Sequence, residues 1–392
     1  MTPPTHPGRR TLLGALALAM AAPARGHAAA PIRIGVLNDQ SSVFADSTGP
    51  GSVLSARMAA EDFGLRLGPI EILAADHQNK PDVGVAIARN WFDRDGVSAI
   101  ADLGNSAVAL AVADLARQKN KVVLISAGGT TALTGAQCSP NTVHWTYDTW
   151  SNASTLARAL LARGQDSWFF ITADYTFGRN LQDEASRVLQ QAGGTVAGAA
   201  LHPINNADFS SVLLQAQASR AKVVALANGG DDTGRALKQA REFQISPAQT
   251  VIGMSAVITD VAGLGLASAE GLLLTETFYW NLDDGTRAFG RRWAARNQGR
   301  YPTMMQAGVY AAVWHYLKAL AESPAPTDGA AVVARMKAMP TDDPLFGKGT
   351  IRADGRCLHD SFVFRVKSPA ESREPWDFYD LVARVPAGQS IR

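Results

Sequence analysis

Short runs of β-forming residues alternate with helical segments along most of this chain, and no other feature of the sequence restricts the fold as strongly. The first series of runs covers residues 32–37, 70–75, 98–103 and 121–126. Strands separated by helical segments are typical of parallel sheets, because a parallel partner needs a crossover connection. The stretch 122–125 is apolar on both faces, as expected of a strand that helices cover on both sides. The sequence therefore predicts an α/β fold with parallel central sheets.

A second series of runs follows a region rich in aromatic and turn residues at 144–148. These runs and the helical segments between them lie at 167–172, 178–191, 195–200, 222–227, 233–243, 250–254 and 271–276. Two long amphipathic helices, at 286–298 and 306–320, and two terminal strands, at 360–366 and 376–385, are expected later in the chain. The chain has 392 residues, of which 46% are hydrophobic. A chain of this length exceeds what a single hydrophobic core usually organises. We expect two similar α/β lobes.

The first 28 residues have the order of a signal peptide. Arg9 and Arg10 precede an apolar run of about 11 residues, which is short of the roughly 20 that span a bilayer. Small residues follow, with a cleavage site after Ala28. The paired arginines indicate the twin-arginine type, and an ordinary Sec signal stays open. A soluble periplasmic protein without its signal peptide is expected.

Charge disfavours nucleic acid as a partner. The whole chain has 37 Lys+Arg and 35 Asp+Glu. Removing Arg9, Arg10 and Arg25 with the signal peptide leaves 34 Lys+Arg against 35 Asp+Glu. A nearly neutral chain lacks the basic stripe that binding to a phosphate backbone requires.

Local motifs for catalysis, cofactors and metals are absent from the sequence. There is no GxSxG, no P-loop and no GxGxxG. The histidines of the mature chain lie far apart in sequence: His77, His144, His202, His315 and His359. No catalytic residue, cofactor or metal is expected, and a triad assembled in space stays open. For the two cysteines, Cys138 and Cys357, one disulfide stays open, and two buried thiols are slightly favoured.

The loops after the strands offer contacts for a small molecule, because ligands of open α/β sheets bind beyond the carboxyl ends of the strands. Asn105 and Ser106 stand at a helix start, where free N–H groups favour an anion. Gly128 and Thr130 follow the next strand, where glycine lets the backbone approach a ligand. Together they predict a carboxylate cradle. A plain helix cap at Asn105 and a plain turn at Gly128 are the alternatives.

The corresponding loops of the second lobe carry aromatic and acidic residues. Tyr175 and Phe177 follow one strand and are candidates to cover the apolar part of a ligand. Asn228 and Asp231 follow the next strand. Ordinary packing for the aromatic rings, and a solvated turn or a helix cap for Asp231, are the alternatives.

Five segments carry a resemblance to a known family. They are 34–37, Asn105-Ser106, 125–130, 174–178 and 310–313. In their order and spacing they resemble the periplasmic solute-binding proteins of the leucine/isoleucine/valine type, over nearly the whole mature chain. The resemblance implies two Rossmann-like lobes joined by three hinge crossings. Lobe 1 would comprise 29–145 and 277–340, and lobe 2 would comprise 146–276 and 341–392.

The resemblance also implies roles for individual residues. The carboxylate contacts of the family match Ser106, Gly128 and Thr130. Its first-lobe loop contacts match 44–47, which includes Phe44 and Asp46, and its aromatic wall matches Phe177 with Tyr175 beside it. Near the second crossing, Met305 and Gln306 match a pocket residue and its neighbour.

One departure from the family pattern bears on the ligand. Amino-acid-binding members carry an acidic residue that pairs with the ligand's ammonium group. At the matching position this chain has the uncharged segment 253–256. An unpaired buried ammonium is costly. We therefore expect a small organic carboxylate, with aromatic acids among the candidates, and delivery to an ABC permease by a monomer. Binding of a branched-chain amino acid, a sensing role beside a separate receptor, and an exported enzyme acting on a small carbonyl compound are the alternatives.

Overall fold

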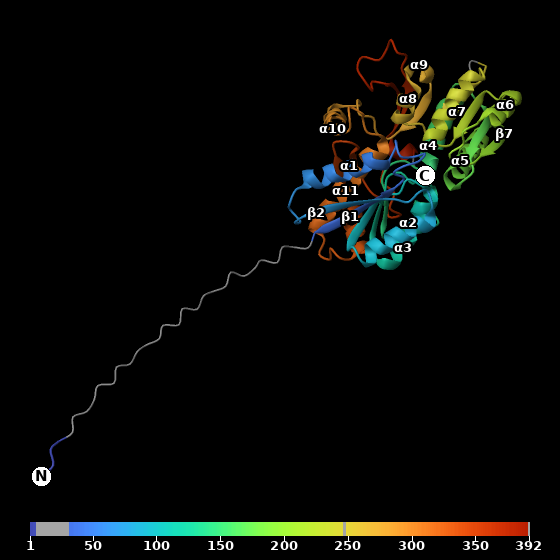
Figure 1. Cartoon of the computed structure of the whole chain (residues 1–392). Helices are drawn as coiled ribbons and strands as arrows, with labels where there is room; N and C mark the ends of the chain where they lie inside the picture. The colour runs from blue at the N-terminus through green and yellow to red at the C-terminus, as the bar shows by residue number, and fades with distance from the viewer. Residues whose placement is uncertain (5–30, 246–247, 391–392) are drawn as a thin grey trace.

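The computed structural model describes residues 1–4, 31–245 and 248–390 (Figure 1). Apart from residues 1–4, the expected signal peptide lies outside these residues, as does its cleavage site. Within them, no helix has the length and apolarity needed to cross a membrane.

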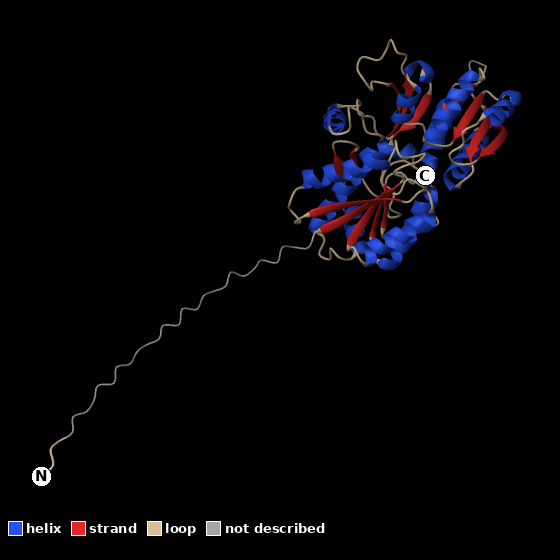
Figure 2. Ribbon diagram, viewed as in Figure 1, coloured by secondary structure: helices blue, strands red, loops and turns tan. Residues whose placement is uncertain are grey.

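A five-stranded parallel sheet forms the first half of the molecule (Figure 2). Its strand order is β2-β1-β3-β4-β5. The strands are β1 (Ile32–Asn38), β2 (Ile70–Asp76), β3 (Val97–Asp102), β4 (Val122–Ile125) and β5 (Thr142–His144). Four of them match the first predicted series. The three-residue β5 was not predicted.

Helices cover both faces of this sheet (Figure 1). On one face lie α2 (Pro81–Asp93) and α3 (Ser106–Lys119), whose apolar residues form one core with Leu37 and Ile125. On the other face α1 (Gly49–Phe63) packs along α11 (Met304–Glu322). The remaining helices of this half are η1 (Thr131–Thr134), α10 (Asp284–Ala295) and α12 (Gly329–Ala338).

A four-stranded parallel sheet forms the second half, with strand order β7-β6-β8-β9. Its strands are β6 (Ser167–Ala173), β7 (Thr195–His202), β8 (Val223–Ala227) and β9 (Thr250–Gly253). The helices of this half are α4 (Thr149–Leu161), α5 (Thr176–Gln191), α6 (Ser210–Ser219), α7 (Asp231–Glu242), α8 (Ile258–Leu264) and α9 (Leu266–Ala269). The α/β prediction is confirmed in both halves.

The late strands form a third, antiparallel sheet of order β10-β13-β14. Its strands are β10 (Leu273–Glu276), β13 (Ser361–Val366) and β14 (Tyr379–Val385), and β14 is followed by the short helix α13 (Ala387–Ser390). The predicted run 271–276 is thus a strand, but it pairs antiparallel with β13 instead of extending the parallel sheet. A hairpin of β11 (Thr341–Asp343) and β12 (Gly347–Gly349) precedes this sheet in the chain.

The chain passes between the two halves at 145–148, at 277–283 and after α12. The third passage also touches the first sheet, because the amide of His144 bonds to the carbonyl of Gly355 at 2.9 Å and the amide of Cys357 bonds to the carbonyl of His144 at 2.9 Å. The lobe boundaries 29–145 with 277–340 and 146–276 with 341–392 stay a prediction.

The two cysteines are not joined. Cys357 is buried and Cys138 is exposed, and both are free thiols. The favoured interpretation of two buried thiols is therefore right for Cys357 and wrong for Cys138, which lies in an exposed turn after η1.

Candidate functional site

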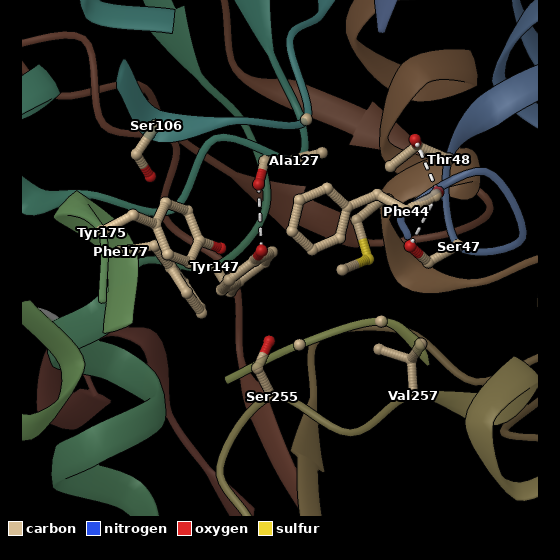
Figure 3. Close-up of a pocket in the computed structure, with 14 residues that line it drawn as sticks. Phe44, Ser47, Thr48, Ser106, Ala127, Tyr147, Tyr175, Phe177, Ser255 and Val257 are labelled. Atoms are coloured by element: carbon tan, nitrogen blue, oxygen red, sulfur yellow. Dashed lines mark hydrogen bonds between the residues drawn. The ribbon is translucent and has the colours of Figure 1, made fainter. Parts of the chain in front are cut away.

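A narrow cavity lies between the two parallel sheets, beyond the carboxyl ends of their strands (Figure 3). The space free of protein atoms in it is about 400 Å³, which includes its mouth open to solvent. None of the described residues that line it is charged. The lining residues are Phe44, Ser47, Thr48, Gly104, Ser106, Ala127, Tyr147, Tyr175, Phe177, Gly229, Gly230, Ser255, Val257 and Met305.

The loop between β1 and α1 forms one wall and is fixed by hydrogen bonds. The Asp39 carboxylate accepts the amides of Phe44 at 2.9 Å and Ser42 at 2.8 Å. Burial alone would raise the pKa of Asp39, but the hydrogen bonds that it accepts outweigh burial and lower it. Nε2 of Gln306 donates to the carbonyl of Thr48 at 3.1 Å. Phe44 and Thr48 are thereby held against the cavity.

The start of α3 forms the end of the cavity that favours an anion. Oδ1 of Asn105 caps the helix by accepting the amides of Ala107 at 3.0 Å and Val108 at 3.3 Å. The next side chain, Ser106, is 2% exposed, and its hydroxyl has no hydrogen-bond partner among the described residues. The helix dipole and an unpaired donor at the same place favour a negatively charged ligand group.

A buried carboxyl group fixes the loop that carries Ser106. Asp102 accepts Nδ2 of Asn38 at 2.7 Å and the hydroxyl of Ser126 at 2.9 Å. Complete burial raises its pKa, although these hydrogen bonds oppose the rise. Asp102 and Leu103 have φ angles of 82° and 58°. Such strained backbone persists only where the surroundings hold it, and it concentrates at functional sites.

Four aromatic rings line the cavity from both halves, as Figure 3 shows. Ring centroids are 6.4 Å apart for Phe44 and Tyr175, 6.0 Å for Tyr175 and Phe177, and 6.2 Å for Phe177 and Tyr147. The Tyr147 hydroxyl donates to the carbonyl of Ala127 at 2.9 Å. Within the described chain no hydrogen bond is made by the Tyr175 hydroxyl. The rings give the cavity an apolar body with polar groups at its ends.

Five of the twelve predicted site residues line this cavity: Phe44, Ser106, Tyr175, Phe177 and Met305. Their part in binding stays a prediction. The cap alternative holds for the Asn105 side chain, whose oxygen is used within α3. Gln306 acts on the cavity only through the loop that it holds.

The other predicted residues also lie outside the cavity lining. Gly128 packs on α3, where a Cβ would lie 2.8 Å from that of Ala109. Asn228 is buried beside His202 and Thr233. Asp46 and Asp231 form ion pairs with arginines, Asp46 with Arg300 at 3.0 Å and Asp231 with Arg235 at 3.2 Å.

Thr130 belongs to a contact between the two halves. Its hydroxyl is 3.0 Å from Oδ1 of Asn180 on α5, and the neighbouring Thr131 donates to Glu184 of the same helix at 2.6 Å. Across the cavity the amide of Asp231 bonds to the carbonyl of Val43 at 3.1 Å. These bonds join the halves directly, and we call this arrangement closed.

Sequence reasoning missed Tyr147, Ser255 and Val257 as cavity residues. Tyr147 lies in the first passage between the halves, and the other two follow β9. The only sequence feature that could have indicated them is their place within a few residues after a strand end, at the edge where the two sheets meet. Among the described residues no cluster of three or more metal-ligating side chains is present.

Two parallel sheets that meet at their carboxyl ends across an uncharged, partly aromatic cavity define a two-lobed α/β protein that binds small molecules. The family model for periplasmic binding proteins matches residues 31–372, so the chain belongs to that family. The resemblance to the leucine/isoleucine/valine type is confirmed by its relatives, which are binding proteins rather than enzymes.

Solved structures match over most of the chain. A periplasmic binding protein from Burkholderia mallei is 41% identical, with a TM-score of 0.89, over 92% of this chain and 96% of that one. A branched-chain amino acid ABC transporter periplasmic ligand-binding protein from Burkholderia xenovorans is 39% identical, with a TM-score of 0.82 and the same coverage.

Curated relatives match over a shorter stretch. The Leu/Ile/Val-binding protein homolog 6 of Brucella abortus is 25% identical over 197 residues, which are 49% of this chain and 50% of that protein. The match therefore spans about half the length of these curated relatives.

Proposed function

We propose that this chain is the exported binding component of an ABC importer, which closes its two lobes on a small organic carboxylate and delivers it unchanged to the permease. Aromatic acids are among the candidates. The observation that carries the proposal is a cavity with an anion-favouring helix start at one end, aromatic walls, and no charged side chain in its lining.

The lining favours a carboxylate over a zwitterion. A carboxylate at the start of α3 would gain the unpaired Ser106 hydroxyl and the helix dipole, and hydrogen bonds to a charged group are worth about 1.5–3 kcal/mol each. An ammonium group would meet no carboxylate. Asp231 is paired with Arg235, and Asp260 caps α8 by accepting the amide of Val257 at 2.9 Å. The cost of an unpaired buried cation disfavours amino acids.

A branched-chain amino acid is the second candidate, because the names of the Burkholderia xenovorans and Brucella abortus relatives favour it. In that case the ammonium group would depend on neutral oxygens, such as those of Tyr175 and Ser255. Export and the permease partner are supported by the family and by the twin-arginine pattern of the first 28 residues. A monomer is the expected state.

Calorimetric titration of the mature chain tests the proposal. The probes are benzoate, its neutral isostere benzamide, propionate and leucine. We expect benzoate to bind at least about tenfold more tightly than benzamide, because only the carboxylate uses the start of α3. Carboxylates should also bind more tightly than leucine. Leucine as the tightest probe, or equal binding of benzoate and benzamide, would overturn the carboxylate assignment.

A further inference from the structure

Two glycines of the cavity lining are not required by the fold. A Cβ on Gly104 would have only ordinary contacts, 3.4 Å from Oγ1 of Thr48 and 3.9 Å from the Cβ of Ala127. A Cβ on Gly229 would lie 3.8 Å from Oγ of Ser255 and 3.9 Å from the ring of Phe44. Neither glycine has a φ angle in the left-handed region. An alanine therefore suits the backbone and the protein neighbours at both positions.

Three neighbouring glycines give the contrast. A Cβ on Gly230 would lie 2.3 Å from the carbonyl oxygen of Val43, and this residue has a φ of 64°. A Cβ on Gly129 would lie 2.7 Å from the ring of Phe177, and one on Gly128 would lie 2.9 Å from the carbonyl oxygen of Leu103. The fold excludes a side chain at these three positions. It does not exclude one at Gly104 or Gly229.

Gly104 and Gly229 line the same cavity from opposite halves of the molecule. Gly104 follows β3 and stands two residues before Ser106, at the end that favours an anion. Gly229 follows β8 and lies between Phe44 and Ser255, along the aromatic walls. A side chain at either place would occupy ligand space, because the cavity is narrow.

We propose that Gly104 and Gly229 determine ligand selectivity. The space left by their missing side chains admits a carboxylate whose apolar body is the size of a ring. Gly104 leaves space for the carboxylate group, and Gly229 leaves space for the apolar body. This inference rests on the proposed function and deepens it. It assigns the two residues different effects. An alanine at 229 discriminates by the size of the ligand body, whereas an alanine at 104 weakens all carboxylates.

The experiment titrates benzoate and propionate into the parent chain, Gly229→Ala and Gly104→Ala. We expect Gly229→Ala to weaken benzoate about tenfold or more, since overpacking a tight site costs this much, and to change propionate less than about threefold. Gly104→Ala should weaken both ligands. Melting temperatures near that of the parent would show that both variants fold.

Gly234→Ala is the matched control. Gly234 lies in α7 away from the cavity, and a Cβ there has nothing within 4 Å. This variant should bind both probes like the parent and be slightly more stable, because alanine favours a helix.

The outcomes separate the two proposals. If the parent binds benzoate and Gly229→Ala binds it equally well, or loses benzoate and propionate by the same factor, the role of Gly229 is overturned while the proposed function stands. If Gly104→Ala binds both probes like the parent, the role of Gly104 is overturned. A parent chain that binds neither carboxylate overturns both the proposed function and this inference.

Discussion

The hydroxyl of Ser106 is buried at the start of α3 and has no partner within the described chain. Leaving a buried donor unpaired costs about 1–3 kcal/mol. A ligand that accepts this hydrogen bond removes the cost, so the group favours the bound state over the free one. At the scale of single residues, this is the strongest indication of where a carboxylate sits.

Replacing Ser106 with alanine should separate binding from stability. We expect Ser106→Ala to weaken benzoate about tenfold or more, because a hydrogen bond to a charged group is lost. The melting temperature should stay the same or rise slightly, because an unpaired buried hydroxyl is removed. Calorimetry and thermal unfolding measure the two effects.

The control for that variant is Ser154→Ala. Ser154 is another buried serine whose hydroxyl has no partner among the described residues, and it lies in α4, outside the cavity lining. It should change stability in the same direction and leave binding unchanged. If both variants bind benzoate as the parent does, Ser106 does not contact the ligand.

A second residue-scale prediction concerns pH. Burial at the end of β10 raises the pKa of Glu276 to about 8, against a hydrogen bond from Tyr379 and with Asp260 adding to the rise. The folded state therefore binds a proton that the unfolded state releases near pH 4.5, so this contribution to stability is present at low pH and is lost as pH rises toward 8. Thermal unfolding between pH 5 and pH 8 should show a smaller decline for Glu276→Gln than for the parent. An equal decline would mean that Glu276 is charged in the folded protein.

The direction of single side chains in the candidate site could not be predicted from the sequence. The sequence allows Asn105 equally as a helix cap and as a cradle residue, because both uses follow from one polar side chain at a helix start. In the structure its side-chain oxygen accepts an amide of α3. Ser106, one position on, faces the cavity. Side-chain direction at a helix start depends on the preceding backbone, and here Asp102 and Leu103 adopt positive φ angles that nothing in the sequence indicates.

At the scale of elements, the closed state depends on direct contacts between η1 and α5. The Thr131 hydroxyl donates to Glu184, whose pKa burial raises. Neither residue lines the cavity, so we expect this bond to stabilise closure equally for every ligand. In the same region the Thr130 hydroxyl lies 3.0 Å from Oδ1 of Asn180, and its expected contact with a carboxylate stays a prediction.

Thr131→Val should therefore weaken all ligands by a similar factor. The expected loss is about threefold to tenfold, the value of one hydrogen bond. Titrations of benzoate and propionate measure it. The control is Thr195→Val on the exposed strand β7, which should bind like the parent. A loss confined to one of the two ligands would place Thr131 at the ligand instead of between the halves.

The main elements could be predicted because they obey local rules. The fully buried run of β8 reads as apolar on both faces, and the loop after α11 is marked by prolines. Features without a local pattern could not be predicted, and β5 and β10 are two examples. With three residues, β5 is too short for a pattern, and β10 pairs antiparallel with a strand that follows it by more than eighty positions.

At the scale of the whole molecule, the cavity lies between two sheets whose halves meet through loops and through the contact of η1 with α5. The cavity is made by residues from both halves, so a ligand can contact all of them only when the halves are closed. A ligand that shifts an opening equilibrium from 1:99 to 99:1 needs about 5.5 kcal/mol of preference for the closed state. Two or three hydrogen bonds to a carboxylate and burial on four aromatic rings supply an energy of that size.

A crystal structure of the mature chain grown with the carboxylate that binds most tightly in the titrations tests this account most directly. We predict the ligand between the two sheets, chemically unchanged, with a carboxylate oxygen within hydrogen-bond distance of the Ser106 hydroxyl and its apolar body between Phe44 and Phe177. A ligand bound at any other surface, or a carboxylate turned away from the start of α3, would contradict it.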